Sequence, residues 1–545
     1  VLEAYLDDGF KIVILGAPTG AGKSLLGAVI AEVLHQKQGV GPLSSFLLNG
    51  TNVLAQQYDD TFCKKKEGST DFTFLKGANN YQCTALSGEE YISAEACSLS
   101  AFQNNVMDEI IDEHCKSCEF QRIKRRKNEA KNLITNYSYY FIDRMYLADT
   151  PAAMEKRTLA VFDEAHTIND LFVEHNAIYF SEKRLKSYHE EAADALRLGN
   201  TEVFKNIKTI QTDLVAGKIT DQNYMQYLKL LHGVYKAISA QAEKEAEQNV
   251  KNVSLYNKLI RISKKYFGLG CKIDDLIIYQ YDHIFEYKKF EQEVSVKAIF
   301  VSDMFDKLIN SEYMLFMSAT ITPQFLIDTL GLKKEEVKFV QLAPSFPKES
   351  KKVVFYSPMQ LNYTTLKEEK TITMLQNRVK NIVKKHSSEG EKGIVLTPSF
   401  DLTRQICDVL VWENNKYEVF EHKRGEKLEV ILNEFKKYKK GPAVLVSPSL
   451  FEGISLDGDI SRYQVFVKAP YPSLGDKRMK HILDNHPEIY SFVTLIKVIQ
   501  GMGRSTRSAE DHSVTYCLDQ SLQRLWKSPQ NIWTNEFSVN FTSMI

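Results

Sequence analysis

Short apolar runs recur along the N-terminal part of the chain, beginning with Ile12-Val13-Ile14-Leu15. Each run is too short for a helix, and its apolar positions are too continuous for a strand with one face in solvent. Strands of a parallel sheet that is covered by helices on both faces have this pattern. The pattern therefore predicts buried parallel strands at residues 12–15, 46–48, 133–135, 159–162 and 313–316.

A second series of such runs follows in the C-terminal part, where stretches of helical composition separate its members. Strands and helices that alternate in this way predict a second α/β unit, with a junction near residues 342–347. The predicted strands of this unit lie at residues 353–355, 394–396, 444–446, 465–467 and 514–516.

A long segment without proline interrupts the first series of strands, between Pro151 and Pro323. Within it, Tyr224, Leu228 and Leu231 belong to an apolar set that recurs at helical spacing. This periodicity predicts a helical insertion at residues 183–290.

The chain has 545 residues, of which 43% are hydrophobic and 25% are charged, so it is long enough for at least two domains. Its 69 basic residues balance 69 acidic residues, and a nucleic acid would therefore bind in a local channel. The sequence has no apolar stretch of about 20 residues and no signal-peptide pattern. We therefore expect an intracellular protein without membrane contact, cytoplasmic if bacterial or phage-encoded and nuclear if eukaryotic.

A glycine-rich loop follows the first predicted strand and precedes a helical pattern. Within residues 16–24, residues 17–24 match the pattern GxxxxGK[ST] with Ala17 in place of its first glycine, in the strand, loop and helix context that a phosphate-binding loop requires. Its backbone N–H groups can surround phosphates, Lys23 can reach the β- and γ-phosphates, and the Ser24 hydroxyl can bind Mg²⁺. The predicted ATP-binding residues are Gly16, Ala17, Pro18, Thr19, Gly20, Ala21, Gly22, Lys23 and Ser24.

Two adjacent carboxylates follow the predicted strand at residues 159–162. Asp163 suits coordination of Mg²⁺, and Glu164 suits polarisation of the water that attacks the γ-phosphate. An isolated Asp-Glu pair at a strand end is more often a solvated junction, but the phosphate loop upstream favours a catalytic pair. The two motifs together predict an ATP hydrolase.

Six short motifs give the chain a resemblance to a known family. They are DEAH at 163–166, SAT at 318–320, QGMGRSTR at 500–507, FLKGANNYQC at 74–83, ITNY at 134–137 and FEG at 451–453. Over residues 10–520 the chain resembles the iron–sulfur superfamily 2 DNA helicases of the XPD and DinG type. The resemblance implies two RecA-like motor domains, ATP and Mg²⁺ as cofactors, and 5′ to 3′ movement along single-stranded DNA.

The resemblance also implies roles for nucleotide-site residues that spacing alone does not identify. Gln500, Arg504 and Arg507 would close on ATP, and the arginines would neutralise charge in the transition state. His166 of the DEAH motif and Gly453 would also belong to the nucleotide site.

Residues in two other segments are candidate contacts to nucleic acid. Thr51 and Gln57 match a motif that lies along single-stranded DNA in the family. Lys124, Arg125 and Arg126 form a basic run that follows the cysteine-rich segment. Such a run is as often a solvated helix face as a contact to the DNA backbone, and both interpretations stay open.

Four of the eight cysteines fall between residues 83 and 118. Cys83, Cys97, Cys115 and Cys118 could hold a [4Fe–4S] cluster or a tetrahedral zinc ion, and their spacing alone favours zinc. The resemblance implies the iron–sulfur cluster, since its motif leads directly into Cys83. Cys63 is the spare candidate ligand.

These features predict an ATP-dependent 5′ to 3′ DNA helicase or translocase that acts as a monomer on single-stranded and forked DNA. A P-loop ATPase that remodels RNA or a protein complex without unwinding DNA is the alternative. The expected domains are motor domain 1 at 1–82, 119–182 and 291–342, an iron–sulfur insertion at 83–118, a helical arch at 183–290 and motor domain 2 at 343–545.

Overall fold

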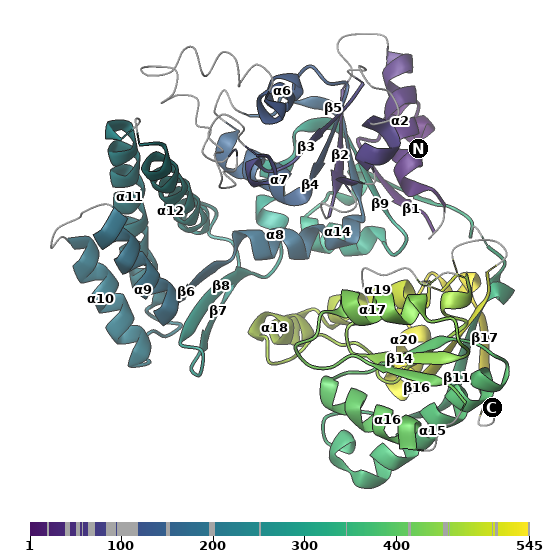
Figure 1. Cartoon of the computed structure of the whole chain (residues 1–545). Helices are drawn as coiled ribbons and strands as arrows, with labels where there is room; N and C mark the ends of the chain where they lie inside the picture. The colour runs from purple at the N-terminus through teal and green to yellow at the C-terminus, as the bar shows by residue number, and fades with distance from the viewer. Residues whose placement is uncertain are drawn as a thin grey trace. The chain divides into compact units, whose positions relative to one another are not determined.

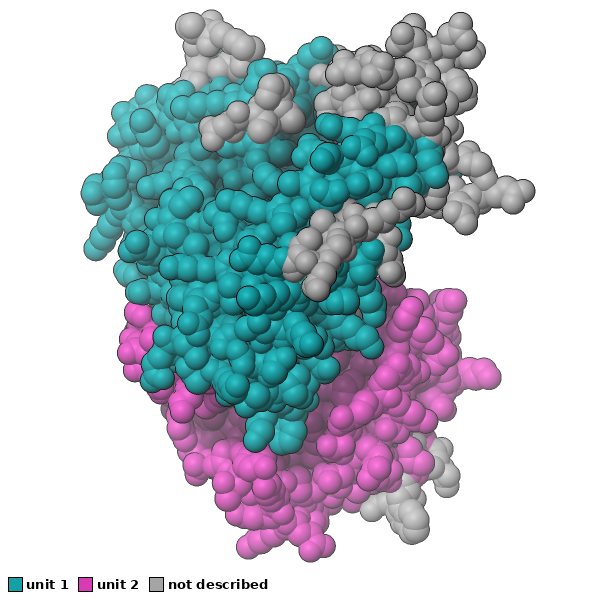
Figure 2. Space-filling view, turned by 90° about the vertical axis from the view of Figure 1, so that its left-hand side faces the viewer, with its two compact units in different colours: residues 1–15, 24–317, 322–340 teal, residues 16–23, 318–321, 341–545 magenta. Residues whose placement is uncertain are grey.

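The structure of the protein is a computed structural model with two units. Residues 1–15, 24–317 and 322–340 form the first unit, and residues 16–23, 318–321 and 341–545 form the second (Figure 2). The structure describes residues 1–18, 21–38, 44–50, 55–56, 58–63, 71–82, 94, 118–148, 153–195, 202–249, 252–344, 346–412, 416–450, 456, 458–503, 505–506 and 511–542.

The strands predicted in the N-terminal part belong to one seven-stranded sheet with the order β10-β1-β9-β5-β2-β4-β3 (Figure 1). Strand β2 pairs in parallel with β4 and β5, β3 pairs with β4, and β5 pairs with β9. The strands are β1 (Ile12–Gly16), β2 (Ser45–Asn49), β3 (Phe72–Leu75), β4 (Asn132–Asn136), β5 (Arg157–Asp163), β9 (Ser311–Ser318) and β10 (Val337–Gln341).

The strands predicted in the C-terminal part form a second seven-stranded sheet, β13-β14-β12-β15-β16-β11-β17, in which all neighbours are parallel. The predicted α/β class with parallel sheets is therefore confirmed. The strands are β11 (Lys351–Met359), β12 (Gly393–Leu396), β13 (Glu418–Glu421), β14 (Ala443–Ser447), β15 (Tyr463–Phe466), β16 (Ser513–Asp519) and β17 (Ser538–Thr542).

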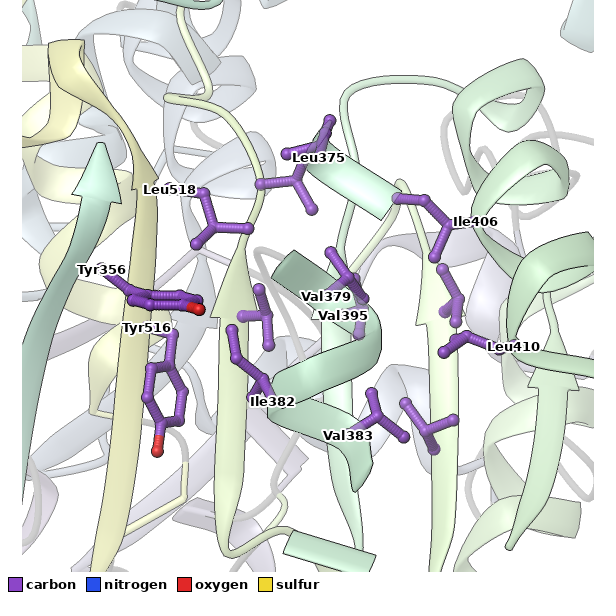
Figure 3. Close-up of a cluster of buried hydrophobic side chains, with 14 of the residues drawn as sticks. Tyr356, Leu375, Val379, Ile382, Val383, Val395, Ile406, Leu410, Tyr516 and Leu518 are labelled. Atoms are coloured by element: carbon purple, nitrogen blue, oxygen red, sulfur yellow. The ribbon is translucent and has the colours of Figure 1, made fainter. Parts of the chain in front are cut away.

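Helices cover the second sheet and bury its apolar side chains. Leu375, Val379 and Ile382 of α15 pack against Val395 of β12 and Leu518 of β16 (Figure 3). Because apolar residues of the helix recur every three or four positions, one stripe of α15 faces the strands. The helices of this region are α15 (Glu369–Ser388), α16 (Phe400–Trp412), α17 (Leu428–Lys437), α18 (Lys477–Asn485), α19 (Pro487–Met502) and α20 (Gln520–Trp526).

The stretch predicted as a helical insertion contains long helices, and α11 and α12 pack side by side (Figure 1). It also adjoins an antiparallel three-stranded sheet, β6-β8-β7, which the helical periodicity did not predict. The elements are β6 (Ile178–Ser181), α9 (Glu182–Glu190), α10 (Glu202–Val215), α11 (Tyr224–Gln248), α12 (Val253–Tyr279), β7 (His283–Lys288) and β8 (Glu293–Ala298).

Among the described residues, the remaining α-helices of the first unit lie between the strands of its sheet in sequence, except α1, which precedes β1. They are α1 (Leu2–Leu6), α2 (Lys23–Gln38), α6 (Glu119–Arg126), α7 (Tyr137–Ile142), α8 (Ile168–Asn176), α13 (Phe305–Leu308) and α14 (Pro323–Leu330). Among the residues that the structure describes, no helix combines the length and the apolar character needed to cross a membrane.

Candidate nucleotide-binding site

The predicted phosphate loop connects β1 to α2. The Ala21 N–H donates a hydrogen bond to the Pro18 carbonyl at 3.1 Å, and Gly22 adopts a φ of +71°, which favours glycine. Helix α2 then begins at Lys23, and its first turn contains no acidic residue. The N-terminus of a helix attracts anions because its first N–H groups have no partner within the helix. This geometry suits a bound phosphate, although Thr19 and Gly20 lie outside the described residues.

Helix α2 lies close to the sheet because Gly27 has no side chain. A Cβ atom at this position would lie only 2.9 Å from Val161 of β5 and from Met317 of β9. The first turn of α2, with Ser24, is thereby held near the end of β5, where the predicted carboxylates follow.

Asp163 is the last residue of β5, and its side chain is held by several hydrogen bonds. Its Oδ2 atom accepts a hydrogen bond from the Tyr58 hydroxyl at 2.9 Å, and its Oδ1 atom accepts one from the Glu164 N–H at 3.0 Å. The Ser24 side chain lies close enough to the Tyr58 hydroxyl to lower the pKa of Tyr58. The two predicted Mg²⁺ ligands, Ser24 and Asp163, therefore both lie near one tyrosine hydroxyl, and their oxygens suit a hard cation.

Glu164 has a left-handed backbone conformation, with a φ of +52°. The N–H and hydroxyl groups of Thr167 both donate to its carbonyl, at 3.0 and 2.8 Å, and hold the turn in place. The Glu164 carboxylate lies 3.4 Å from Nδ1 of His166. A non-glycine residue in this region is strained, and such strain is concentrated at functional sites. The turn thus places the predicted catalytic carboxylate directly after the predicted metal ligand.

Tyr137, the first residue of α7, supports the same strand end. Its fully buried hydroxyl donates to the Asp163 carbonyl at 2.6 Å. The preceding Asn136 caps α7 by accepting a hydrogen bond from the Tyr139 N–H at 2.7 Å. The Asn-Tyr pair that carried part of the family resemblance therefore positions the backbone of the acidic motif.

Gln500 lies near the C-terminal end of α19 in the second unit. The next residue, Gly501, allows α19 to approach β15, since a Cβ atom there would lie 2.7 Å from the Phe466 ring. Gln464 of β15 also donates to the Met502 carbonyl at 3.1 Å. The glycine of this motif therefore has a packing role. Arg504, Arg507 and Gly453 lie outside the described residues, and their roles stay predictions.

The two described ends of the predicted cluster segment pack together. Tyr81, Ala94 and Phe120 form a small apolar cluster, with the Tyr81 and Phe120 rings 5.4 Å apart, and Cys118 packs against it. The remaining predicted cluster ligands, Cys83, Cys97 and Cys115, lie outside the described residues.

The predicted nucleic-acid contacts are described only in part. Thr51, Gln57 and the side chain of Arg125 lie outside the described residues, whereas Lys124 and Arg126 are half-buried on α6. The next residue, Lys127, is buried, and its ammonium group donates to the Ala153 carbonyl at 3.2 Å. Burial lowers the pKa of Lys127. The basic segment is therefore partly anchored in the protein.

Sequence reasoning did not identify Tyr58 as a residue of this site. It follows Gln57 directly, but nothing in the local sequence indicates a contact with Asp163, which lies 105 positions away.

Among the described residues, one further group could hold a metal ion, formed by His386, Glu389 and Glu391. His386 is already hydrogen-bonded to Glu391 at 2.5 Å and to Tyr516 at 2.9 Å, which favours a structural role.

A phosphate loop, an acidic pair after a nearby strand and a second parallel sheet define a P-loop ATPase of the helicase class. Residues 1–201 match the family model of the type III restriction enzyme res subunit, and residues 380–536 match that of the helicase C-terminal domain. A search of curated proteins finds no match.

Solved structures of XPD helicases have the same fold along the whole chain. The structure titled "XPD_Helicase" is 16% identical with a TM-score of 0.61, covering 99% of this chain and 98% of its own. Xpd4 of S. tokodaii is 14% identical with a TM-score of 0.57, covering 98% and 96%. Together with the family models, these similarities confirm the resemblance drawn from the motifs. The chain therefore has the fold of the XPD helicases, and residues 380–536 match a helicase C-terminal domain.

Proposed function

We propose that the protein is an ATP-dependent DNA helicase that moves 5′ to 3′ on single-stranded DNA and unwinds duplexes, and that it acts as a monomer. The position of Asp163 and Ser24 beside the Tyr58 hydroxyl carries the ATP-hydrolysing part of this proposal, because these oxygens suit Mg²⁺ and lie near a helix N-terminus that suits a phosphate. In this proposal Lys23 binds the phosphates and Glu164 orients the attacking water. Gln500, Arg504 and Arg507 stabilise the transition state.

The rate of ATP hydrolysis with and without single-stranded DNA tests the activity. We expect strong stimulation by DNA in the wild-type protein and loss of turnover in Lys23→Ala and Glu164→Gln. Lys11→Ala is the matched control, because Lys11 is exposed and precedes β1. Normal turnover in Lys23→Ala, or stimulation by RNA and not by DNA, would contradict the proposal.

Strand displacement from tailed duplexes tests the direction of movement. A motor that moves 5′ to 3′ unwinds a duplex with a 5′ single-stranded tail and leaves one with only a 3′ tail intact. A forked duplex should be unwound as well. We expect strong salt dependence with weak sequence preference, since such a motor contacts phosphates and stacks bases. Unwinding from the 3′ tail alone would refute the proposed polarity.

We also propose that Cys83, Cys97, Cys115 and Cys118 bind a [4Fe–4S] cluster. The packing of Tyr81 and Cys118 into one apolar cluster supports this, because residue 82, next to Cys83, and Cys118 then lie near each other. Four thiolates can stabilise a segment that is too short to build its own core.

Metal analysis after anaerobic purification tests the cluster. We expect about four iron and four sulfide per chain in the wild-type protein and loss of iron in Cys118→Ser. Cys271→Ser should retain full iron, because Cys271 belongs to α12. Stoichiometric zinc without iron would refute the cluster and leave the helicase assignment intact. If Cys97→Ser keeps its iron and Cys63→Ser loses it, Cys63 is the true ligand.

A further inference from the structure

The Tyr58 hydroxyl contacts a different kind of group from the hydroxyls of three other tyrosines that are buried in the first unit. The hydroxyls of Tyr5, Tyr137 and Tyr140 each donate to a backbone carbonyl, as buried tyrosines commonly do. The Tyr58 hydroxyl instead donates to a side-chain oxygen of Asp163, and the Ser24 side chain lies near it. It therefore lies beside two side chains that the proposed function assigns to Mg²⁺.

From this contact we infer that Tyr58 is a positioning residue for the magnesium site, a role that rests on the proposed function. A donor that bonds to a carboxylate oxygen fixes the orientation of the carboxylate. A carboxylate has about four lone-pair positions, so a bond from Tyr58 leaves room for an ion or its water. Tyr58 thus holds Asp163 in the direction that a cation requires.

The surroundings of Tyr58 keep its hydroxyl in place. The residue is only 2% exposed, and its ring contacts that of Phe62 at 5.8 Å, which in turn stacks on Phe72 of β3 at 5.2 Å. These ring contacts fix the position of the hydroxyl that donates to Asp163.

The variant Tyr58→Phe tests this role, because it removes the hydroxyl and keeps the ring. The direct measurement is binding of Mn²⁺, in the presence of a non-hydrolysable ATP analogue, followed by electron paramagnetic resonance. We expect the dissociation constant for Mn²⁺ to rise about tenfold, as for other residues that orient metal ligands. The Mg²⁺ concentration that half-saturates ATP hydrolysis should rise similarly, with little change in kcat at saturating Mg²⁺.

Tyr5→Phe is the matched control, since it removes a buried hydroxyl that donates to the Met314 carbonyl at 2.8 Å elsewhere in the same unit. It should leave Mn²⁺ binding unchanged while lowering the melting temperature about as much as Tyr58→Phe. Asp163→Asn supplies a second test. If Tyr58 acts through Asp163, adding Tyr58→Phe to Asp163→Asn causes no further loss of Mn²⁺ binding.

Two negative results have different meanings. If the wild-type protein binds Mn²⁺ with the nucleotide and Tyr58→Phe binds it equally well, the positioning role is wrong and the proposed function stands. A full additional loss in the double variant would likewise overturn the role. If the wild-type protein does not bind Mn²⁺ with the nucleotide, the proposed function fails together with this inference.

Discussion

Arg157 stabilises the strand that carries the acidic motif, and its replacement should cost the first unit much of its stability. The residue is 3% exposed, at the start of β5. Its guanidinium donates to the carbonyls of Lys127 at 2.5 Å, Ala130 at 2.7 Å, Lys131 at 3.2 Å and Ser45 at 3.3 Å. It therefore joins the chain that follows α6 to strands β2 and β5.

The expected magnitude follows from these bonds. Burial lowers the pKa of Arg157 to about 10, so the group stays charged at neutral pH. Arg157→Met keeps an apolar side chain against the Phe46 ring but leaves four carbonyls without this donor. Each hydrogen bond to a charged group contributes about 1.5–3 kcal/mol, and such losses are not additive. We expect a total loss of about 3–5 kcal/mol, typical of a broken buried charge network.

The assay must report on the first unit alone. All three tryptophans, Trp412, Trp526 and Trp533, lie in the second unit, so tryptophan fluorescence reports on the wrong part of the chain. Hydrogen exchange measured by mass spectrometry on peptides from β2, β4 and β5 resolves the first unit directly. Protection of these strands should fall strongly in Arg157→Met, while the fluorescence transition of the second unit changes little.

Lys131→Met is the matched control. Lys131 lies near Arg157 but forms a partly exposed ion pair with Glu32 at 2.8 Å. Such pairs contribute at most about 1 kcal/mol, so this variant should lose little protection. Arg157→Lys should fall between the two, because it keeps the charge but not the planar fork of donors. If Arg157→Met loses no more protection than Lys131→Met, the reasoning is refuted.

Three further predictions concern the acidic turn, a buried histidine and the second unit. Glu164→Gly should abolish turnover yet stabilise the first unit by up to about 1 kcal/mol, because glycine accepts the φ of +52° without strain. This gain should appear as greater hydrogen-exchange protection. Glu164→Gln should abolish turnover without the gain in protection. Burial, and next the charge of Lys272, lower the pKa of His175 to about 4, so the unfolded state takes up the proton first. The free energy of unfolding of the first unit should therefore fall as pH drops from about 6.5 to about 4, by roughly 1–2 kcal/mol between pH 7 and 5. The wild-type protein and the exposed-site control His189→Phe should show this loss. His175→Phe should not. Arg504→Ala should lower kcat more than it weakens ATP binding, since a transition-state contact acts on the barrier; an effect on ATP affinity alone would contradict this role.

The central strands were predictable from the sequence because they are covered on both faces. Residues 159–162 and 444–446, for example, are apolar without interruption and became the interiors of β5 and β14. The phosphate loop and the acidic pair were equally visible, since each places its chemistry within a few consecutive residues. Where an entire structural feature is encoded in one short segment, its pattern indicates that feature directly.

The edge strands had no such pattern. Three of the four edge strands of the two seven-stranded sheets, β10, β13 and β17, are partly exposed along their length, because an edge strand has a neighbour on one side only. Their mixed apolar and polar residues resemble those of loops. The hairpin of β7 and β8 was missed for a similar reason, since half-exposed residues are mixed irregularly with buried ones in both strands.

The sequence by itself determined the two α/β units and the short motifs from which ATP binding is predicted. Only the tertiary structure decided which distant residues support that chemistry. Tyr58 meets Asp163 across 105 positions, and Arg157 reaches the Ser45 carbonyl across 112. A tyrosine or an arginine in an apolar segment has no local partner that would identify its role. Such contacts arise because parallel pairing brings separate strands together, and burial then requires each polar group to find a partner there.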